Sequence, residues 1–154
     1  MKIKFKGQKL LILYLFLFIL ILTSPFWLWT FKDSKLLNVL IIDKTVPSTD
    51  FREHEGFVWL LNNEKYVKKN KQAYSVQQDY VGFKPERNKT FKIENLPENM
   101  NQYDLIYLTD LYGVYKEEFE NSNQSGERSE QVYGGLTNDE VEKLDKTLLT
   151  WGRR

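Results

Sequence analysis

The sequence predicts an α/β protein in which an N-terminal transmembrane helix precedes a partial, doubly wound and mainly parallel sheet. Three observations favour this class. Residues 10–31 carry no charge and are rich in Leu, Ile and Phe, while the largely apolar runs at 36–42 and 103–110 each end at an aspartate, Asp43 and Asp110. Such runs are typical of parallel strands covered on both faces, and patterns typical of helices lie between and after them.

The uncharged run is long enough to cross a bilayer. Its 22 residues span roughly 33 Å as a helix, against about 30 Å for the hydrocarbon core. The run is apolar on every face, whereas a helix in a globular core carries an apolar stripe. Pro25 is expected to kink or end the helix before an aromatic cluster that suits the membrane interface: Phe26, Trp27, Trp29 and Phe31.

Charge predicts the orientation of this helix. Four lysines precede it within nine residues and little net charge follows it, so the positive-inside rule places the N-terminus in the cytoplasm. We therefore expect a cytoplasmic tail over residues 1–9, a single-pass signal-anchor over residues 10–31 and a tether over residues 32–35. An extracytoplasmic domain then occupies residues 36–154. The alternative is a cleaved signal peptide, but bulky aromatics follow the small residues at 23–25, which fits a cleavage site badly.

The extracytoplasmic part reads as alternating strands and helices. Residues 36–42 predict a buried strand, and a capping-box-like spacing of Asp50 and Glu53 predicts a helix running to about residue 67. Residues 73–81 and 90–93 are weaker strand candidates, separated by glycine and proline. Residues 103–110 form the second clear strand, which we expect to lie parallel to the first and beside it.

A final helix is predicted after a polar loop over residues 121–131. Thr137 and Glu140 have capping-box spacing, and four apolar side chains share one face of the following helix: Val141, Leu144, Leu148 and Trp151. This helix has no later strand to return to. We therefore expect residues 36–154 to be C-terminally incomplete, with part of that helix face left exposed and with an open sheet edge that invites a partner chain.

Several segments together resemble a known family. These are the strand Asn38–Asp43 with its Asp-Lys-Thr-Val-Pro turn, the strand Tyr103–Asp110, and the Gly-Gly-Leu-Thr-Asn-Asp-Glu helix start at 134–140. In this order they resemble the N-terminal part of class I glutamine-amidotransferase-like (flavodoxin-like) domains, in the membrane-tethered branch of unknown function from Gram-positive bacteria. The chain departs from the active family, because it has no cysteine and lacks the nucleophile strand and the later His/Glu region. The resemblance therefore implies the fold and no amidotransferase activity.

Candidate ligand-binding residues cluster after the two clear strands. Asp43 and Asp110 follow them directly, where open α/β sheets bind ligands, although aspartates there also cap turns. Tyr112 and Tyr115 follow on the same loop and suit ligand contact or plain packing. His54, the only histidine, lies on the apolar side of its predicted helix, where a structural role is the competing interpretation.

Composition argues against several classes of function. Beyond residue 32 the chain has 17 basic and 21 acidic residues, a net charge of −4, which argues against a nucleic-acid surface. Without cysteine it has no disulfide and no thiolate metal site, and we expect no metal or cofactor. The leading hypothesis is a non-catalytic domain that binds a ligand, a protein partner or the missing C-terminal half at the lipid bilayer. Alternatives are an extracytoplasmic hydrolase using Asp43, His54 and Asp110, and a truncated remnant of a longer membrane protein.

Overall fold

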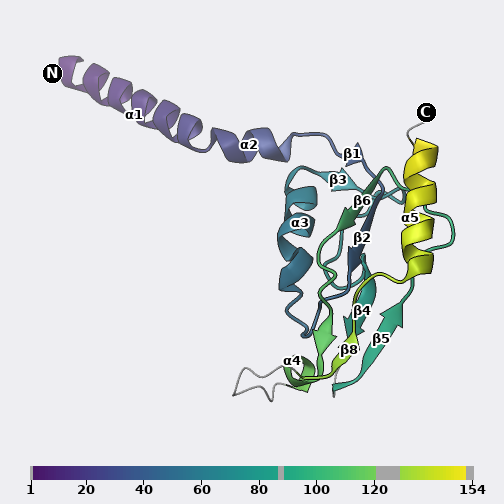
Figure 1. The fold of residues 1–154 in the computed structure, drawn as a ribbon. Helices are drawn as coiled ribbons and strands as arrows, with labels where there is room; N and C mark the ends of the chain where they lie inside the picture. Colours follow the sequence, from purple (N-terminus) through teal and green to yellow (C-terminus); the bar gives the residue numbers. More distant parts are fainter. Residues whose placement is uncertain (1, 87–88, 121–128, 152–154) are drawn as a thin grey trace. The chain divides into compact units, whose positions relative to one another are not determined.

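The computed structural model describes residues 2–86, 89–120 and 129–151 and separates the chain into two compact units, 1–33 and 34–154 (Figure 1). The first unit contains helices α1 (Lys2–Leu22) and α2 (Ser24–Thr30). The second holds the sheet and the remaining helices. The mixed α/β class expected from the sequence is confirmed.

The N-terminal unit is a bent pair of helices: residues 10–31 do not form one continuous helix, and the kink expected from Pro25 is confirmed. The two helices meet at Thr23 at an angle of 51°. Pro25 explains the break, because it has no N–H to donate to the Ile21 carbonyl one turn earlier. The Ser24 hydroxyl donates to that carbonyl instead, at 2.7 Å.

Neither helix of this pair alone is long and apolar enough to cross a membrane, and the same holds for every other helix in the described part of the chain. The stretch Gly7–Leu22 and α2 meet the length and composition criteria only together. From residue 7 to residue 31 every side chain is exposed except that of Thr23, which is half-buried.

A four-stranded sheet forms the centre of the second unit, in the order β5–β4–β2–β6. Its strands are β2 (Val39–Asp43), β4 (Val81–Pro85), β5 (Phe91–Glu94) and β6 (Leu105–Leu108). β2 runs parallel to both β4 and β6, and Val39 to Ile42 pair in register with Leu105 to Leu108. The prediction that these two runs are parallel neighbours is therefore confirmed, while β5 is antiparallel to β4.

Short strands and three helices complete the unit. β1 (Lys35–Leu36) pairs with β3 (Tyr66–Val67), and β7 (Val114–Tyr115) pairs with β8 (Gln131–Tyr133). The helices are α3 (Arg52–Asn63), α4 (Lys116–Glu120) and α5 (Asn138–Trp151). Of the loop predicted over residues 121–131, residues 121–128 lie outside the described residues, and Gln131 belongs to β8.

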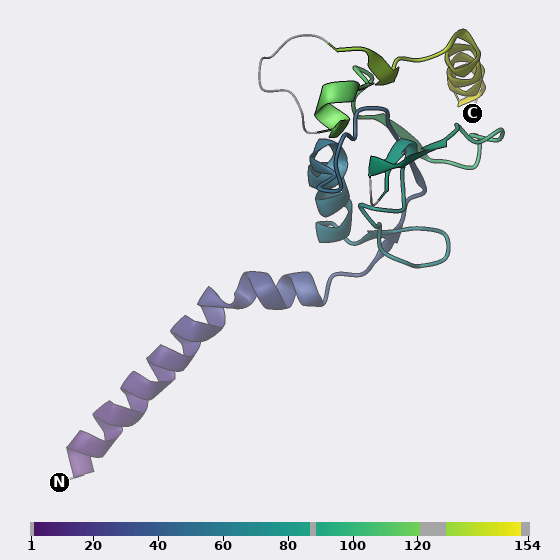
Figure 2. The ribbon, with the colours of Figure 1, turned by 90° about the horizontal axis from the view of Figure 1, so that it is seen from below.

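Two hydrophobic clusters lie on opposite faces of the sheet, because successive side chains of a strand alternate between faces. Val39 and Ile41 of β2 pack with Val58 and Leu61 of α3. Leu40 and Ile42 pack on the other face with Leu144 of α5. Figure 2 shows α3 and α5 on either side of the strands. This arrangement explains the continuous apolar run that predicted β2.

The strand predicted over residues 36–42 is interrupted at Leu37 and Asn38. The cause is the Tyr74 hydroxyl, which donates to the Leu37 carbonyl at 2.5 Å and accepts from the Val39 N–H at 2.8 Å. The hydroxyl thus takes the place of a neighbouring strand, and β1 and β2 become separate elements. Residues 73–80 form a loop and not the predicted strand, because the Ser75 N–H donates to the Asp79 carboxylate and the Ser75 carbonyl accepts from the Gln78 and Asp79 N–H groups, which closes a turn.

The start of α3 also differs from the prediction. Asp50 does not cap the helix; its carboxylate accepts from Ser48, and the N-cap residue is Phe51 in the left-handed conformation. The helix ends at Asn63, four residues before the predicted end. In contrast, the capping box of α5 is confirmed: the Thr137 N–H donates to Glu140 Oε2 at 2.8 Å, and the Glu140 N–H donates to Thr137 Oγ1.

Gly82 allows β4 to approach β2 closely. A Cβ at this position would lie 1.8 Å from the Asp43 carbonyl oxygen, and its φ of 128° is one that side-chain-bearing residues rarely adopt. The glycine that the sequence pattern assigned to a break between strands therefore lies inside a strand.

The expectation of an exposed helix face is confirmed for α5, although not all four predicted side chains dock. Leu144 is buried and Trp151 is half-buried, whereas Val141 and Leu148 are 48% and 56% exposed. β6 also departs from a strand covered on both faces, with Leu105 and Leu108 38% and 45% exposed. The reason is that β6 is an edge strand of the described sheet.

Candidate functional site

The candidate site lies at the carboxyl ends of β2 and β6, which the parallel register brings side by side. The Lys44 N–H donates to the Asp110 carbonyl at 3.0 Å, so the residues that follow the two strands are adjacent. In open α/β sheets this edge is where ligands usually bind. Five side chains predicted from the sequence are found at or near it: Asp43, His54, Asp110, Tyr112 and Tyr115.

Asp43 and His54 form a fully buried pair. Asp43 Oδ2 lies 2.7 Å from His54 Nδ1, and both side chains have 0% exposure. Asp43 Oδ1 accepts from the Thr45 N–H at 3.0 Å, and His54 Nε2 lies 2.8 Å from the Val76 carbonyl oxygen. The pair thereby joins β2, α3 and the loop before β4.

The hydrogen bonds of this pair fix where its protons lie. A carbonyl oxygen only accepts, so His54 Nε2 must carry a proton and donate it to Val76. The contact between Nδ1 and Asp43 Oδ2 then requires one further proton between them. The pair is therefore either an imidazolium with a carboxylate or a neutral imidazole with a carboxylic acid, and in both cases its net charge is zero.

Asp110 is not part of this network. Its side chain is exposed and accepts from the Tyr112 N–H at 2.8 Å, which is the turn-capping role that short acidic residues often take. The rings of Tyr112 and Tyr115 lie 5.0 Å apart, and Tyr112 is 54% exposed. The structure thus separates the five predicted residues into the buried Asp43–His54 pair, an exposed turn with Asp110 and Tyr112, and the half-buried Tyr115 of β7.

Lys44 is a site residue that sequence reasoning missed. Its side chain is 3% exposed and donates to Glu140 Oε2 at 2.6 Å, which joins the end of β2 to the first turn of α5. Its ammonium also lies 5.1 Å from the Tyr133 ring centroid. Burial acts to raise the pKa of Glu140, but hydrogen bonds from Lys44 and Thr137 outweigh it and hold that pKa below its usual range.

A pocket of about 290 Å³ lies beside this pair, lined by the residues around the start of α5 and by Asn95, Leu96 and Glu98. Lys44 and Lys143 both line it, but each is already paired with a glutamate, Glu140 and Glu98 respectively. The pocket therefore lies at the N-terminal end of α5, and both of its lysines are already neutralised by glutamates. The sequence does not predict burial of Lys44, because a lysine that follows a strand is usually exposed to solvent.

A second acid near the Asp43–His54 pair is the half-buried Glu53 of α3. Burial raises the pKa of its carboxyl group, and the nearby Asp43 carboxylate raises it further. Glu53 Oε2 is buried and has no hydrogen-bond partner within the described part of the structure. Burial therefore makes ionisation of Glu53 less favourable than in water, although a backbone hydrogen bond to its carboxylate partly offsets this.

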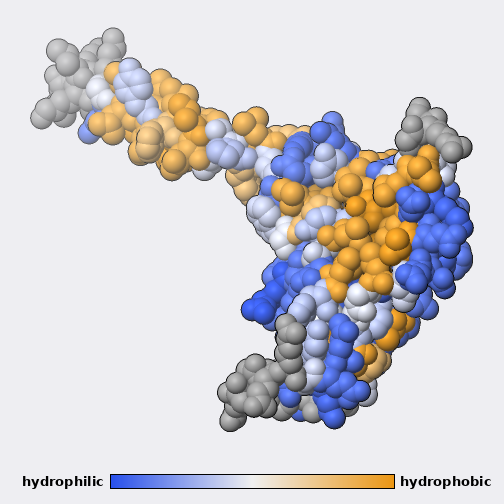
Figure 3. All heavy atoms as spheres, viewed as in Figure 1, coloured by the Kyte–Doolittle hydropathy of each residue, from blue (hydrophilic) through white to orange (hydrophobic). Residues whose placement is uncertain are grey.

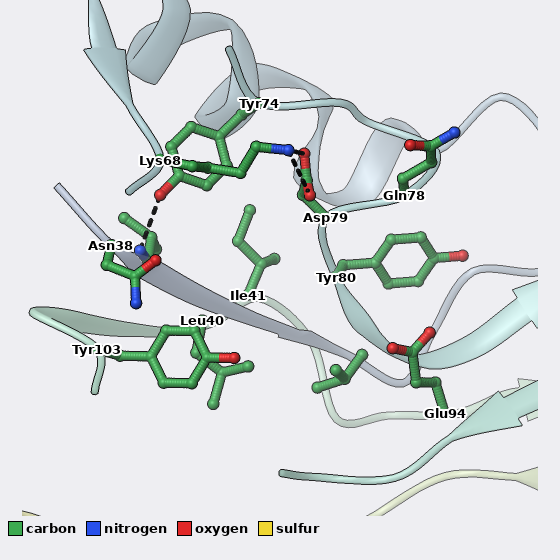
Figure 4. A pocket seen from close by; sticks show the side chains of 12 residues that line it. Asn38, Leu40, Ile41, Lys68, Tyr74, Gln78, Asp79, Tyr80, Glu94 and Tyr103 are labelled. Atoms are coloured by element: carbon green, nitrogen blue, oxygen red, sulfur yellow. Dashed lines mark hydrogen bonds and ion pairs between the residues drawn. The ribbon is translucent and has the colours of Figure 1, made fainter. Parts of the chain in front are cut away.

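Another pocket, of about 230 Å³, opens at the opposite edge of the sheet, where β2 and the chain entering β4 diverge (Figure 4). β4 pairs with β2 only at Ile42 and Asp43, so the segment from Asn38 to Ile41 lines the pocket. The polar lining is largely compensated: Lys68 donates to Asp79 at 2.8 and 2.9 Å, and Glu94 pairs with Lys84. Tyr74, Tyr80 and Tyr103 supply aromatic surface.

The side chains at these two sites offer few groups that are free to react or to bind a metal ion. The ring of the only histidine is enclosed and both its nitrogens have partners. Within the described residues, no group of three or more His, Asp or Glu side chains is placed to hold a metal ion. The polar groups at both edges serve mainly to join strands, helices and loops.

Comparisons of the chain with protein-family models, with curated proteins and with solved structures gave no match. The resemblance to amidotransferase-like domains therefore stays an expectation from the sequence.

Proposed function

We propose that the chain is a membrane-anchored binding protein. In this proposal residues 1–9 lie in the cytoplasm, the helical segment over residues 10–31 holds the protein in the cell membrane, and the domain from Ser34 onward binds a ligand or protein partner outside it. The observation that carries the anchoring role is the exposure of the apolar side chains of α1 and α2. Between residues 7 and 31 the only side chain that is not exposed is Thr23.

Burial of these side chains in lipid would remove the cost of exposing them to water, about 25 cal/mol for each Å² of apolar surface. The bend at Thr23 is compatible with this environment, because Thr23 and Ser24 hydroxyls donate to carbonyls of the preceding turn at 2.8 and 2.7 Å. Such bonds satisfy backbone groups that lipid cannot. Four lysines before the segment support a cytoplasmic N-terminus.

The buried Asp43–His54 pair supports a binding role over catalysis in this proposal. A general base must reach a substrate proton, and His54 has no free nitrogen and 1% exposure. Asp110, the third member of the hydrolase alternative, uses its carboxylate to cap its own turn. The exposed ring of Tyr112, beside the half-buried Tyr115 of β7, is better suited to contact a partner surface than to perform chemistry.

Membrane fractionation with a carbonate wash tests the anchor. The full chain is expected in the membrane pellet, and Leu17→Arg combined with Ile19→Arg should move it to the soluble fraction, because a charge at mid-membrane costs about 2.5–3.5 kcal/mol. The matched control is Lys65→Arg combined with Lys71→Arg in the domain. Release of the unchanged chain by carbonate, or a mature mass that lacks the N-terminal segment, would refute the anchor.

Orientation is tested by a reporter that is active only outside the membrane, fused after Arg154. Activity is expected, and moving the four N-terminal lysines to the other side of the segment should reduce it. An inactive reporter in a fusion of full length would reverse the proposed topology.

A further inference from the structure

The edge of β6 is an unpaired strand edge between two exposed apolar helix flanks. Of the strands that the structure describes, none lies on the far side of β6. Thr109 donates its N–H to the Ile42 carbonyl at 3.0 Å, and successive residues direct their backbone groups to alternate sides of a strand. Leu105 and Tyr107 therefore face β2, whereas Ile106 and Leu108 direct N–H and C=O toward the open edge.

Apolar side chains border this edge on both faces of the sheet. Phe57 of α3 stacks on Tyr107 of β6, with ring centroids 3.8 Å apart, and Leu60 on the same helix is 48% exposed. On the other face, Ile106 packs against the cluster that contains Leu144 of α5, and Val141 and Leu148 of the same helix are exposed. Figure 3 shows apolar surface gathered over β6 and the adjoining side of α5.

Negative charge at the two ends of β6 restricts which kind of partner can bind along this edge. Asp104 directly precedes the strand and Asp110 follows it closely, and both are exposed. A second copy of the chain would be a poor occupant. Parallel self-pairing would set each aspartate against its own copy, and antiparallel self-pairing would set Asp104 near Asp110. Like charges across a strand pair are destabilising.

We propose that β6 is a docking edge for an extended segment of another protein, apolar in its centre and carrying Lys or Arg at both ends, which adds to the sheet as a further strand. The proposal rests on the binding role proposed above and gives it a partner class. Backbone pairing with Ile106 and Leu108 distinguishes this occupant from lipid, which cannot satisfy N–H and C=O groups. Because side chains of a strand alternate, one added strand covers the exposed flanks of both α3 and α5.

The test uses the full chain in detergent micelles and a short synthetic peptide with the core Val-Ile-Val-Leu and a pair of lysines at each end. We expect saturable binding, with slowed hydrogen exchange at the Ile106 and Leu108 amides. The same peptide with alternate core amides N-methylated on its pairing edge should bind at least about tenfold more weakly, because it loses backbone hydrogen bonds. No binding, or equal binding of the methylated peptide, would overturn the proposal.

The charge argument has its own variants. Asp104→Asn with Asp110→Asn keeps a side-chain oxygen for the local hydrogen bonds and should weaken binding of the basic peptide roughly threefold to tenfold. Glu55→Gln with Glu86→Gln, at exposed positions elsewhere, is the matched control and should leave binding unchanged. An equal effect of both pairs would refute the charge complementarity at this edge.

Two other occupants are decided by the same preparation. Dimerisation that the peptide does not reverse, measured by sedimentation, would assign the edge to a second copy. Displacement of the peptide by uncharged phosphatidylcholine titrated into the micelles would assign it to lipid. Either result would overturn the proposal, and neither depends on carbonate extraction. Failure at the β6 edge is therefore distinguishable from failure of the membrane anchor.

Discussion

Replacement of Asp43 by asparagine is expected to cost far less stability than replacement by alanine. In Asp43→Asn the new amide oxygen can still accept from the Thr45 N–H, and the amide nitrogen can donate to His54 Nδ1. His54 then stays neutral and still donates from Nε2 to the Val76 carbonyl. All three buried hydrogen bonds, at 2.7, 2.8 and 3.0 Å, are retained. We expect a loss of about 1 kcal/mol or less in the free energy of unfolding.

Asp43→Ala removes two of those bonds and leaves the half-buried Thr45 N–H and the buried His54 Nδ1 without partners. Breaking a buried pair in this way typically costs about 3–5 kcal/mol. His54→Ala is expected to fall in the same range, and the double alanine variant should cost less than the sum, because the orphaned partner is removed with it. The exposed Asp50→Asn is the matched control and should change stability by about 0.5 kcal/mol or less.

The assay is native-state hydrogen exchange of the Ile42 amide in the full chain, since Ile42 is 0% exposed at the centre of the sheet. Exchange through global unfolding reports the free energy of unfolding directly. If Asp43→Asn proved as destabilising as Asp43→Ala, the carboxylate charge itself would be required. The argument that a single shared proton and its hydrogen bonds are enough would then be refuted.

Three further substitutions test other parts of the domain. Glu53→Gln should stabilise the fold at pH 7. The pKa of Glu53 is raised in the folded state, so its contribution to the free energy of unfolding falls as pH rises above 4.5. Denaturation across pH 4–8 should show this fall in the wild-type protein and not in the variant. Gly82→Ala should cost about 4 kcal/mol or more or prevent folding, because its Cβ would meet the Asp43 carbonyl, and circular dichroism melting would show it. Lys44→Met leaves the Glu140 carboxylate without its ammonium partner, and exchange of the α5 amides should rise by at least about tenfold relative to those of β2.

The sheet was predictable where the sequence has continuous apolar runs. β2 and β6 were correctly predicted as parallel neighbours from their continuous apolar runs, although only β2 is covered on both faces. The capping box of α5 was equally legible, since a Thr and a Glu three residues apart act within one turn. Both signals are local, which is why they survive without knowledge of the tertiary structure.

The remaining features depend on contacts between distant parts of the chain. The Tyr74 hydroxyl interrupts the run from Leu36 to Ile42 from 37 positions away, and no local pattern reveals it. Gly82 looked like a strand breaker because its close approach to Asp43 is visible only in three dimensions. In the site, the position of Asp43 was foreseen, but its partner His54 lies on another element, and Lys44 gave no signal at all.

The first strands after the N-terminal segment determine how the domain bears tension. A pull along the chain from residue 34 meets β1 first, whose ladder with β3 is only two residue pairs long. Tension then reaches the Tyr74 hydroxyl, which is hydrogen-bonded to both the Leu37 carbonyl and the Val39 N–H. Beyond it lies β2, flanked on both sides by parallel strands. Extraction of β2 requires its hydrogen bonds to both neighbouring strands to break together. The β1–β3 pairing and the Tyr74 hydrogen bonds should therefore break under tension before the central sheet does.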